Sequence, residues 1–279
     1  MENASEKPVM QYAISGSGPP LVLVPGGLTG WISWIPHAEV LSQTRRVIRV
    51  QLLNVALGLA EKPLPEGYSA AYEAGALGNT LDLLGIRQAD FAAWSYSALI
   101  ALSFAVNNPR RVRTLTLIEP PAFWLVTRAG PLSPRDQQER DMLESMAGGR
   151  VSEDQLAEFT HVAGFVPREV DPRTLAQWPV WVQHRNSLRM GGSEYRHNED
   201  MALLHAFDRP VLIVKGEGSN PTIQHIADLL GEALPHARVI ELPGGHAAHI
   251  VSMQAFLEEL HQVIEPAAQP HPGVGDSID

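Results

Sequence analysis

The chain contains no cysteine among its 279 residues. This absence excludes a disulfide scaffold, a thiolate nucleophile, an iron–sulfur cluster and a zinc site built on thiolates. Basic residues are also few: 21 Lys and Arg stand against 31 Asp and Glu, a formal net charge of −10. Because nucleic acids and anionic membrane surfaces are recognised largely through positive charge, we expect neither among the partners.

Long apolar runs are absent as well. No segment reaches the roughly 18 apolar residues of a membrane-spanning helix. The first seven residues are polar and include two glutamates, unlike a secretory signal. We therefore expect a soluble, cytoplasmic protein. With 44% hydrophobic and 19% charged residues, the chain can bury a core as one large domain or a domain with an insertion.

Short apolar, strand-like segments alternate with helical segments along most of the chain. Strands are expected at residues 21–24, 46–51, 91–94, 112–118, 210–214 and 238–242, and helices at about 69–84, from 96 onwards, 221–234 and 252–264. Residues 52–65 are expected to have no regular secondary structure. This alternation predicts an α/β fold, with a mostly parallel sheet covered by helices on both faces.

One long segment interrupts that alternation. Residues 122–207 contain helical pieces at about 134–147, 152–159 and 172–188 but no convincing strand. We interpret 1–121 and 208–266 as the core, 122–207 as a helical cap, and the Pro-, Gly- and Ala-rich residues 267–279 as a disordered tail. Trp124, Trp178 and Trp181 of the insertion either form its own small core or line an apolar lid over a pocket.

Ser95 lies where a predicted strand turns directly into a predicted helix. The segment Ala93-Trp94-Ser95-Tyr96-Ser97 places this serine between small residues, as a tight strand-to-helix turn requires. Such a turn projects the hydroxyl outward as a nucleophile. The alternative interpretation is an ordinary serine N-cap.

His246 follows two glycines directly after the last predicted strand. A histidine on such a loop can reach over the sheet edge and act as the general base for a serine. An exposed loop histidine is the alternative. His249 gives a His-x-x-His spacing, but no third ligand stands at a recognisable spacing, so we predict no metal site.

A glycine-rich loop, residues 25–30, follows the first central strand. Its backbone N–H groups, with that of Tyr96 at the start of the next helix, can stabilise an oxyanion. A dinucleotide site would need a G-x-G-x-x-G register and an acidic residue at the end of the next strand, which ends instead at Gln51. No phosphate-binding Gly-Lys-Ser/Thr motif is present, and we predict no cofactor.

The order of these motifs resembles the α/β-hydrolase fold superfamily over residues 9–263. Further points of similarity are Trp34, the strand end at 117–121, the strand at 210–217 and Phe256. The resemblance implies that Ser95 is the nucleophile, that His246 is the base, and that the N–H groups of Gly27 and Tyr96 form the oxyanion hole. It also suggests Leu28, Trp124, Trp178 and Trp181 as residues that contact the substrate.

The acid of the implied triad is missing from its common position. After Gly216, where such hydrolases commonly carry an aspartate, the sequence has Glu217-Gly218-Ser219-Asn220, with a serine in the expected place. Glu119, 24 residues after Ser95 at the end of the next strand, is the best substitute. Glu217 or Asn220 as orienting groups, or a Ser–His dyad without an acid, remain alternatives.

A serine nucleophile argues against the epoxide hydrolases and haloalkane dehalogenases of this fold, which attack through a carboxylate. The resemblance therefore implies hydrolysis of a small hydrophobic ester, thioester or lactone through an acyl-enzyme on Ser95. A ligand-binding protein or receptor with a weakened triad is the alternative from another class. Carbon–carbon bond hydrolysis and serine-type haloperoxidase activity are further alternatives within the fold.

Overall fold

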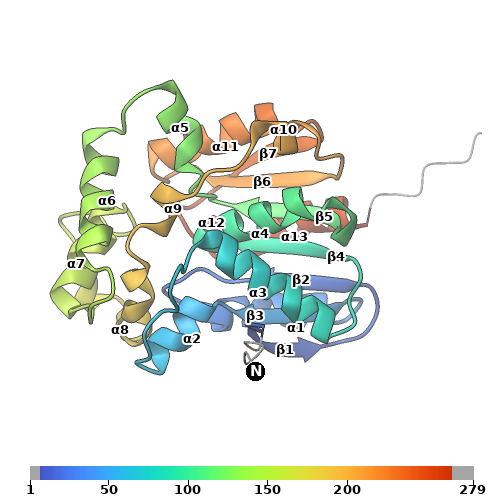
Figure 1. Cartoon of the computed structure of the whole chain (residues 1–279), viewed down its shortest axis with the longest axis horizontal. Coiled ribbons are helices and arrows are strands. Elements are labelled where there is room, and N and C mark those ends of the chain that lie inside the picture. Colours follow the sequence, from blue (N-terminus) through green and yellow to red (C-terminus); the bar gives the residue numbers. More distant parts are fainter. Residues whose placement is uncertain (1–6, 266–279) are drawn as a thin grey trace, which may run out of the picture.

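A computed structural model of the chain describes residues 7–265, which form a seven-stranded sheet in the order β1-β3-β2-β4-β5-β6-β7 (Figure 1). The strands are β1 (Gln11–Ser15), β2 (Pro20–Val24), β3 (Arg46–Gln51), β4 (Ala89–Trp94), β5 (Val112–Ile118), β6 (Val211–Gly216) and β7 (Ala237–Leu242). β1 is antiparallel to β3, and the other neighbours are parallel. The predicted α/β fold with a mostly parallel sheet is confirmed.

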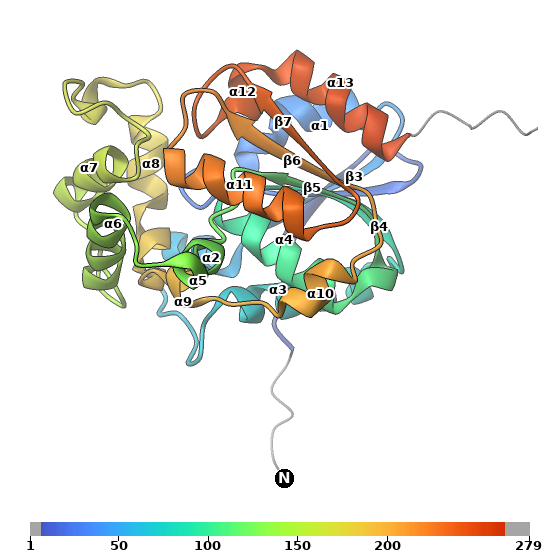
Figure 2. The same cartoon turned by 90° about the horizontal axis from the view of Figure 1, so that it is seen from above.

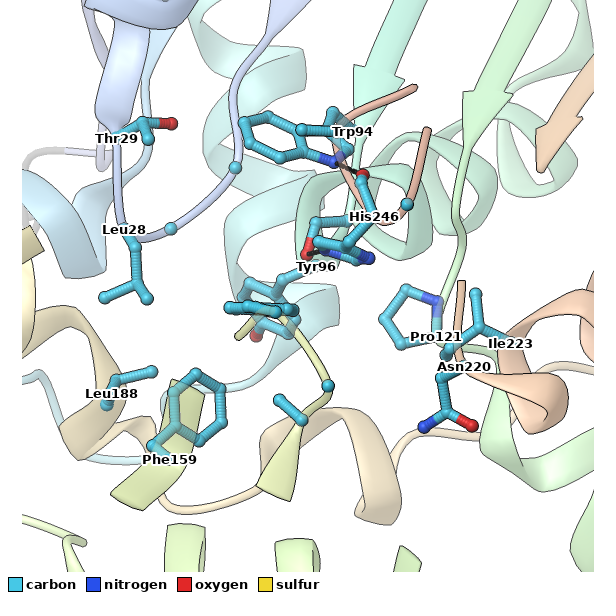
Figure 3. Close-up of a pocket in the computed structure, with 18 of the residues that line it drawn as sticks. Leu28, Thr29, Trp94, Tyr96, Pro121, Phe159, Leu188, Asn220, Ile223 and His246 are labelled. Atoms are coloured by element: carbon cyan, nitrogen blue, oxygen red, sulfur yellow. Dashed lines mark hydrogen bonds between the residues drawn. The ribbon is translucent and has the colours of Figure 1, made fainter. Parts of the chain in front are cut away.

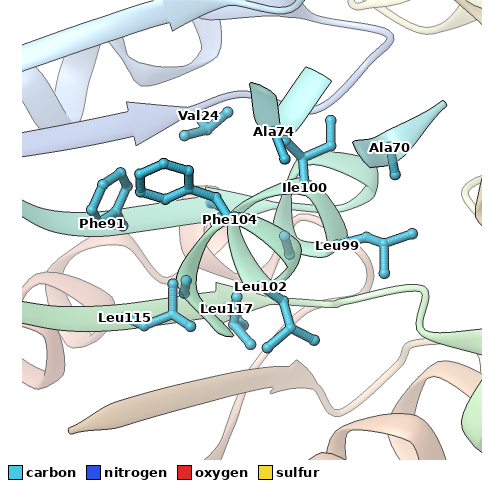
Figure 4. Packing of buried hydrophobic residues seen from close by; sticks show 14 of the residues in the cluster. Val24, Ala70, Ala74, Phe91, Leu99, Ile100, Leu102, Phe104, Leu115 and Leu117 are labelled. Atoms are coloured by element: carbon cyan, nitrogen blue, oxygen red, sulfur yellow. The ribbon is translucent and has the colours of Figure 1, made fainter. Parts of the chain in front are cut away.

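The central strands are apolar on both faces because helices cover both. In β2, for example, Val22 and Val24 pack on one side of the sheet, and Leu21 and Leu23 pack on the other. Helices α3 (Ala70–Leu83), α4 (Tyr96–Asn107) and α11 (Pro221–Ala233) cover the first side, and α1 (Ile35–Leu41) and α13 (Met253–Ile264) cover the second (Figure 2). Figure 4 shows Phe91 of β4 and Phe104 of α4 in the first of these cores, with their ring centroids 5.6 Å apart.

The segment between β5 and β6 contains helices joined by turns and loops, with no strand in the range that the structure describes. It contains α5 (Phe123–Ala129), α6 (Pro134–Ser145), α7 (Glu153–Val162), α8 (Trp178–His184), α9 (Ser193–Arg196) and α10 (Met201–His205), with short 3-10 turns at Pro172–Thr174 and Arg185–Met190. The single helix expected at 172–188 was wrong. Pro179 lacks a backbone N–H, so it fits the first turn of α8 but not the middle of a longer helix.

Helix α2 (Leu53–Leu59) occupies part of the segment expected to be irregular. It has no side-chain cap of its own. Instead the carboxylate of Glu73, on α3, accepts hydrogen bonds from the N–H groups of Leu53 and Asn54, at 3.0 and 2.9 Å. Because the group that stabilises the start of α2 is about 20 residues away, the local sequence carries no cap signal.

The edge strand β1 was also missed. Its side chains are mostly exposed or half-buried, so it lacks the apolar pattern of the central strands. No helix in the part of the chain that the structure describes is long and apolar enough to cross a bilayer. The predicted disordered tail at 267–279 lies outside the described residues.

Two histidines are buried among aromatic rings on the second side of the sheet. His249 is fully buried, 5.0 Å from Trp34 and 5.6 Å from His37 between ring centroids. Nε2 of His37 lies 3.0 Å from the carbonyl oxygen of His249. Burial lowers the pKa of both side chains, and their mutual repulsion lowers the pKa of His249 further. Both are therefore neutral in the native protein near neutral pH.

We expect the free energy of unfolding to fall as the pH drops from 6.5 toward the lowered pKa of these histidines. In that window the unfolded chain binds protons that the folded chain does not, which costs about 1.4 kcal/mol per pH unit for each histidine. Urea unfolding at pH 7.5 and 5.5 measures the loss. His249→Gln should reduce this loss of stability by about the contribution of one histidine. An equal loss of stability in the variant and the parent would contradict the inference that His249 is neutral in the folded protein.

Candidate active site

Ser95 lies at a sharp turn between β4 and α4. Its backbone dihedrals, φ 62° and ψ −135°, fall in a region that residues with a Cβ rarely adopt. The turn is fixed from behind by Ser97, whose hydroxyl lies 2.9 Å from the carbonyl oxygens of Val24 and Trp94. These two contacts accommodate the side chain of Ser97 at a position where glycine is more common. Ser95 does not cap α4 through its side chain, so its hydroxyl is left to project from the turn.

His246 extends from the loop after β7 to Ser95. Its Nε2 atom is 2.9 Å from Oγ of Ser95 (Figure 3). The loop is held by two contacts: the indole N–H of Trp94 donates to the carbonyl oxygen of His246 at 2.7 Å, and the N–H of Gly218 donates to that of Gly244 at 2.7 Å. The loop lies so close to Gly216 that a Cβ there would come within 2.3 Å of a backbone oxygen.

Glu119 completes a chain of three polar groups. It directly follows β5, is fully buried, and holds a positive φ of 51° that turns its side chain toward the histidine loop. Its Oε2 atom lies 3.2 Å from Nδ1 of His246. The carboxylate also accepts a 2.7 Å hydrogen bond from the N–H of Gly216 and one from the hydroxyl of Ser219. Three donors therefore converge on this one buried carboxylate.

The serine at the position where an aspartate is common thus contacts the carboxylate of Glu119, the predicted substitute for that aspartate. Ser219 was not among the residues singled out from the sequence as functional, and its role emerges only once β5 and β6 lie side by side. Of the alternative orienting groups, Glu217 is exposed. Asn220 caps α11 through a 2.9 Å bond to the N–H of Thr222.

Gly27 and Tyr96, the predicted oxyanion donors, both line the cavity in front of Ser95. Tyr96 is the first residue of α4, where a backbone N–H has no acceptor within the helix. Gly27 belongs to the turn after β2, which is closed by a 3.1 Å bond from the N–H of Gly30 to the carbonyl oxygen of Gly26. The two residues thus line the same cavity as Ser95, one from the turn after β2 and the other from the start of α4.

The cavity has a volume of about 450 Å³ and lies between the carboxyl ends of the strands and the inserted helices (Figure 3). Its apolar wall includes Leu28, Phe159, Trp181, Leu188 and Ile223. Phe165, from the inserted segment, stacks on the ring of His246 with centroids 4.6 Å apart and planes 18° from parallel. Ser95 and His246 therefore face a largely apolar chamber.

The four predicted substrate contacts divide into two pairs. Leu28 and Trp181 line the cavity. Trp124 and Trp178 do not. Trp124, on α5, packs in the hydrophobic core, 5.6 Å from the ring of His197, and Trp178 is buried among the inserted helices under the guanidinium of Arg173. For these two the predicted pocket position is corrected, because their helices turn them toward the protein's own core.

The cavity wall also contains polar residues that sequence reasoning missed. They are Asn54 on α2, Glu139 on α6, Ser187 in the turn after α8, and Glu194 on α9. Burial raises the pKa of Glu139 to about 8 and that of Glu194 to about 7. No local sequence pattern indicates them, since tertiary packing sets the orientation of the elements that carry them.

Residues 19–252 match the family model described as the alpha/beta hydrolase fold. The chain belongs to the α/β-hydrolase fold family. Among curated relatives, a 2-hydroxymuconate semialdehyde hydrolase of a Pseudomonas species is 31% identical over 55% of this α/β hydrolase, and the match spans 56% of the relative's length.

Solved structures show the same fold. A hydrolase from Pseudomonas aeruginosa superposes with a TM-score of 0.75 at 21% identity, covering 92% of this α/β hydrolase and 94% of that chain. An enol-lactonase from Burkholderia xenovorans has a TM-score of 0.68 at 22% identity, with 91% and 96% covered.

Proposed function

We propose that this α/β hydrolase cleaves a carboxylic ester, thioester or lactone through an acyl-enzyme on Ser95. The observation that carries the proposal is the hydrogen-bonded chain from Ser95 through His246 to Glu119 at the wall of a largely apolar cavity. The likeness to an enol-lactonase, an enzyme named for a cyclic ester, agrees with this reaction class.

In the proposed mechanism, His246 takes the proton of Ser95 through Nε2 as the hydroxyl attacks the carbonyl carbon. The N–H groups of Gly27 and Tyr96 stabilise the oxyanion of the tetrahedral intermediate. The imidazolium then protonates the leaving alcohol or thiol, and the acyl group stays on Ser95. Water, deprotonated by His246, attacks the acyl-enzyme and releases the acid.

Glu119 is proposed to hold His246 in the tautomer with the proton on Nδ1 and to stabilise the imidazolium. Gly216 and Ser219 support this role, because their hydrogen bonds fix the position of the carboxylate. Residues 122–207 are proposed to act as a cap that excludes water, with Phe165 placed over the imidazole ring.

A fluorophosphonate probe tests the proposal directly. Intact-mass analysis is expected to find one adduct on the wild-type chain, located at Ser95, and none on Ser95→Ala. A panel of nitrophenyl esters of rising acyl length should show a maximum in kcat/KM set by the cavity of about 450 Å³. Well-folded protein without any adduct would overturn the esterase proposal and favour the ligand-binding alternative.

A further inference from the structure

Three buried carboxyl groups gather where the inserted helices meet the cavity. Glu139 and Glu194 line the cavity and are 8% and 6% exposed, and Asp136 lies behind them, one helical turn from Glu139 on α6. Asp136 accepts hydrogen bonds from the hydroxyls of Ser133 and Thr222. The repulsion from Glu194 and Asp136 contributes to the raised pKa of Glu139.

No lysine or arginine in the described range, 7–265, lies within salt-bridge distance of any of these three carboxyl groups. The nearest basic side chains are engaged elsewhere. Arg135 donates to the carbonyl oxygen of Val162, Arg140 pairs with Asp141, and Arg196 donates to the carbonyl oxygens of Gly191 and Met190. From beyond salt-bridge distance, the charge of Arg135 lowers the pKa of Glu139 and that of Arg196 lowers the pKa of Glu194. A buried acidic group without a counter-charge in contact is costly for the folded protein.

Unpartnered acceptors point to a ligand rather than to a self-contained cluster. Within the described part of the chain, Oε2 of Glu194 and Oδ1 of Asn54 are buried with no hydrogen-bond partner. Asn54 is 1% exposed, belongs to a different element and lines the same cavity. Its amide nitrogen is already committed to the carbonyl oxygen of Ser187, at 3.2 Å, so its free atom is an acceptor. Both groups need a donor, and an ammonium group has donors only.

We propose that the substrate carries a cationic amine, which Glu139 and Glu194 bind inside the cavity while Ser95 attacks the ester. This inference rests on the proposed function and names the class of substrate. An ammonium group would supply the missing counter-charge and donate to the free acceptors. The apolar wall around Leu28, Phe159 and Trp181 would hold the carbon chain between the two ends.

The same carboxyl groups make a carboxylate-bearing substrate unfavourable. An anion in this cavity would face two acidic side chains with no lysine or arginine lining the described cavity. The chain's net charge of −10 further favours the approach of cations over anions. Thus the substrate of this hydrolase differs in charge from an acid such as 2-hydroxymuconate semialdehyde, for which a relative is named.

Matched thioesters test the charge preference. One series ends in a dimethylammonium group and the other in the isosteric isopropyl group. In each series the end group is placed in some members on the acyl part and in others on the thiol part of the thioester. Because the chain has no cysteine, the released thiol can be followed with a disulfide reagent without background from the protein. We expect kcat/KM to favour the best charged member over its isostere by about tenfold or more.

Glu139→Gln combined with Glu194→Gln should reduce that ratio to about one, since it removes both negative charges at nearly constant volume. Asp141→Asn is the matched control: it removes an exposed carboxylate from the same helix and should leave the ratio unchanged. A ratio near one in the wild type, or a ratio unchanged in the double variant, would overturn the inference.

Calorimetry separates this inference from the proposed function. Pentylammonium is expected to bind Ser95→Ala more tightly than 1-pentanol and to release a proton at pH 7, because the cation favours ionisation of a carboxyl group whose pKa is about 8. Proton release is measured in buffers of different ionisation enthalpy. A fluorophosphonate adduct without selective ammonium binding would refute only the cation site, whereas selective binding without an adduct would refute only the esterase.

Discussion

Replacement of Ser95 by alanine is expected to lower kcat for ester hydrolysis by about 10⁵-fold, because no other group can form the acyl-enzyme. Oγ of Ser95 is 2.9 Å from Nε2 of His246. The residual rate over the uncatalysed reaction would come from the oxyanion donors and from substrate binding. Steady-state kinetics with the best nitrophenyl ester measures the loss. A variant that keeps more than about a hundredth of the wild-type kcat would show that Ser95 is not the nucleophile.

The backbone at Ser95 supplies a second readout for the same position. Its φ of 62° is strained for alanine as much as for serine, and glycine relieves the strain. We therefore expect Ser95→Gly to be inactive yet more stable to urea than Ser95→Ala by about 1 kcal/mol, after allowance for the flexibility of glycine in the unfolded chain. Equal stability of the two variants would mean that the turn stores no strain.

The juxtaposition of Ser95, Glu119 and His246 could be predicted from sequence because each lies in the turn or loop after a parallel strand of the sheet. Carboxyl ends of neighbouring parallel strands meet at one edge of the sheet, so the order of strands largely determines which residues meet. Ser95 after β4, Glu119 after β5 and His246 after β7 obey that rule. The positive φ of Glu119, by contrast, could not be predicted, since it depends on the contacts with Gly216 and Ser219.

The cavity wall was harder to predict because tertiary packing sets which side of each element faces the cavity. Trp178 and Trp181 lie on the same seven-residue helix, yet only Trp181 lines the cavity. Which side of such a helix faces the pocket depends on how its neighbours pack, and the amino-acid composition of the helix does not indicate this packing. Asn54 was missed for a related reason, since helix α2 depends on a carboxylate from α3 for its first hydrogen bonds.

The second large effect is expected at Glu119, where glutamine should lower kcat by about 10³- to 10⁴-fold. The carboxylate accepts from three donors: the N–H of Gly216, the hydroxyl of Ser219 and Nδ1 of His246. A carboxamide has one acceptor oxygen and a donor NH₂ group. If its oxygen faces Gly216, its NH₂ group meets His246 and forces the proton onto Nε2, where it blocks general-base catalysis.

Folding must be measured beside activity in this variant. The carboxamide NH₂ group cannot accept the hydrogen bonds that the carboxylate accepts. This mismatch should reduce the free energy of unfolding by about 1–3 kcal/mol, which leaves a folded but slow enzyme. Circular dichroism and urea unfolding establish that the protein is intact. Glu217→Gln is the matched control on the neighbouring loop: its side chain is exposed, and we expect kcat within about twofold of the wild type.

The position of the acid can be tested by moving the carboxylate from residue 119 to residue 219. Glu119→Gly removes the carboxylate while permitting the positive φ, and Ser219→Asp adds a carboxylate beside the vacated position. We expect the double variant to exceed Glu119→Gly in kcat by about tenfold or more, because the introduced carboxylate regains the contact with Nδ1 of His246. If Glu119→Gln keeps most of its activity and the double variant gains nothing over Glu119→Gly, the imidazole is oriented without a carboxylate. In that case catalysis would rest on the pair of Ser95 and His246, with Trp94 holding the histidine loop through its 2.7 Å indole bond.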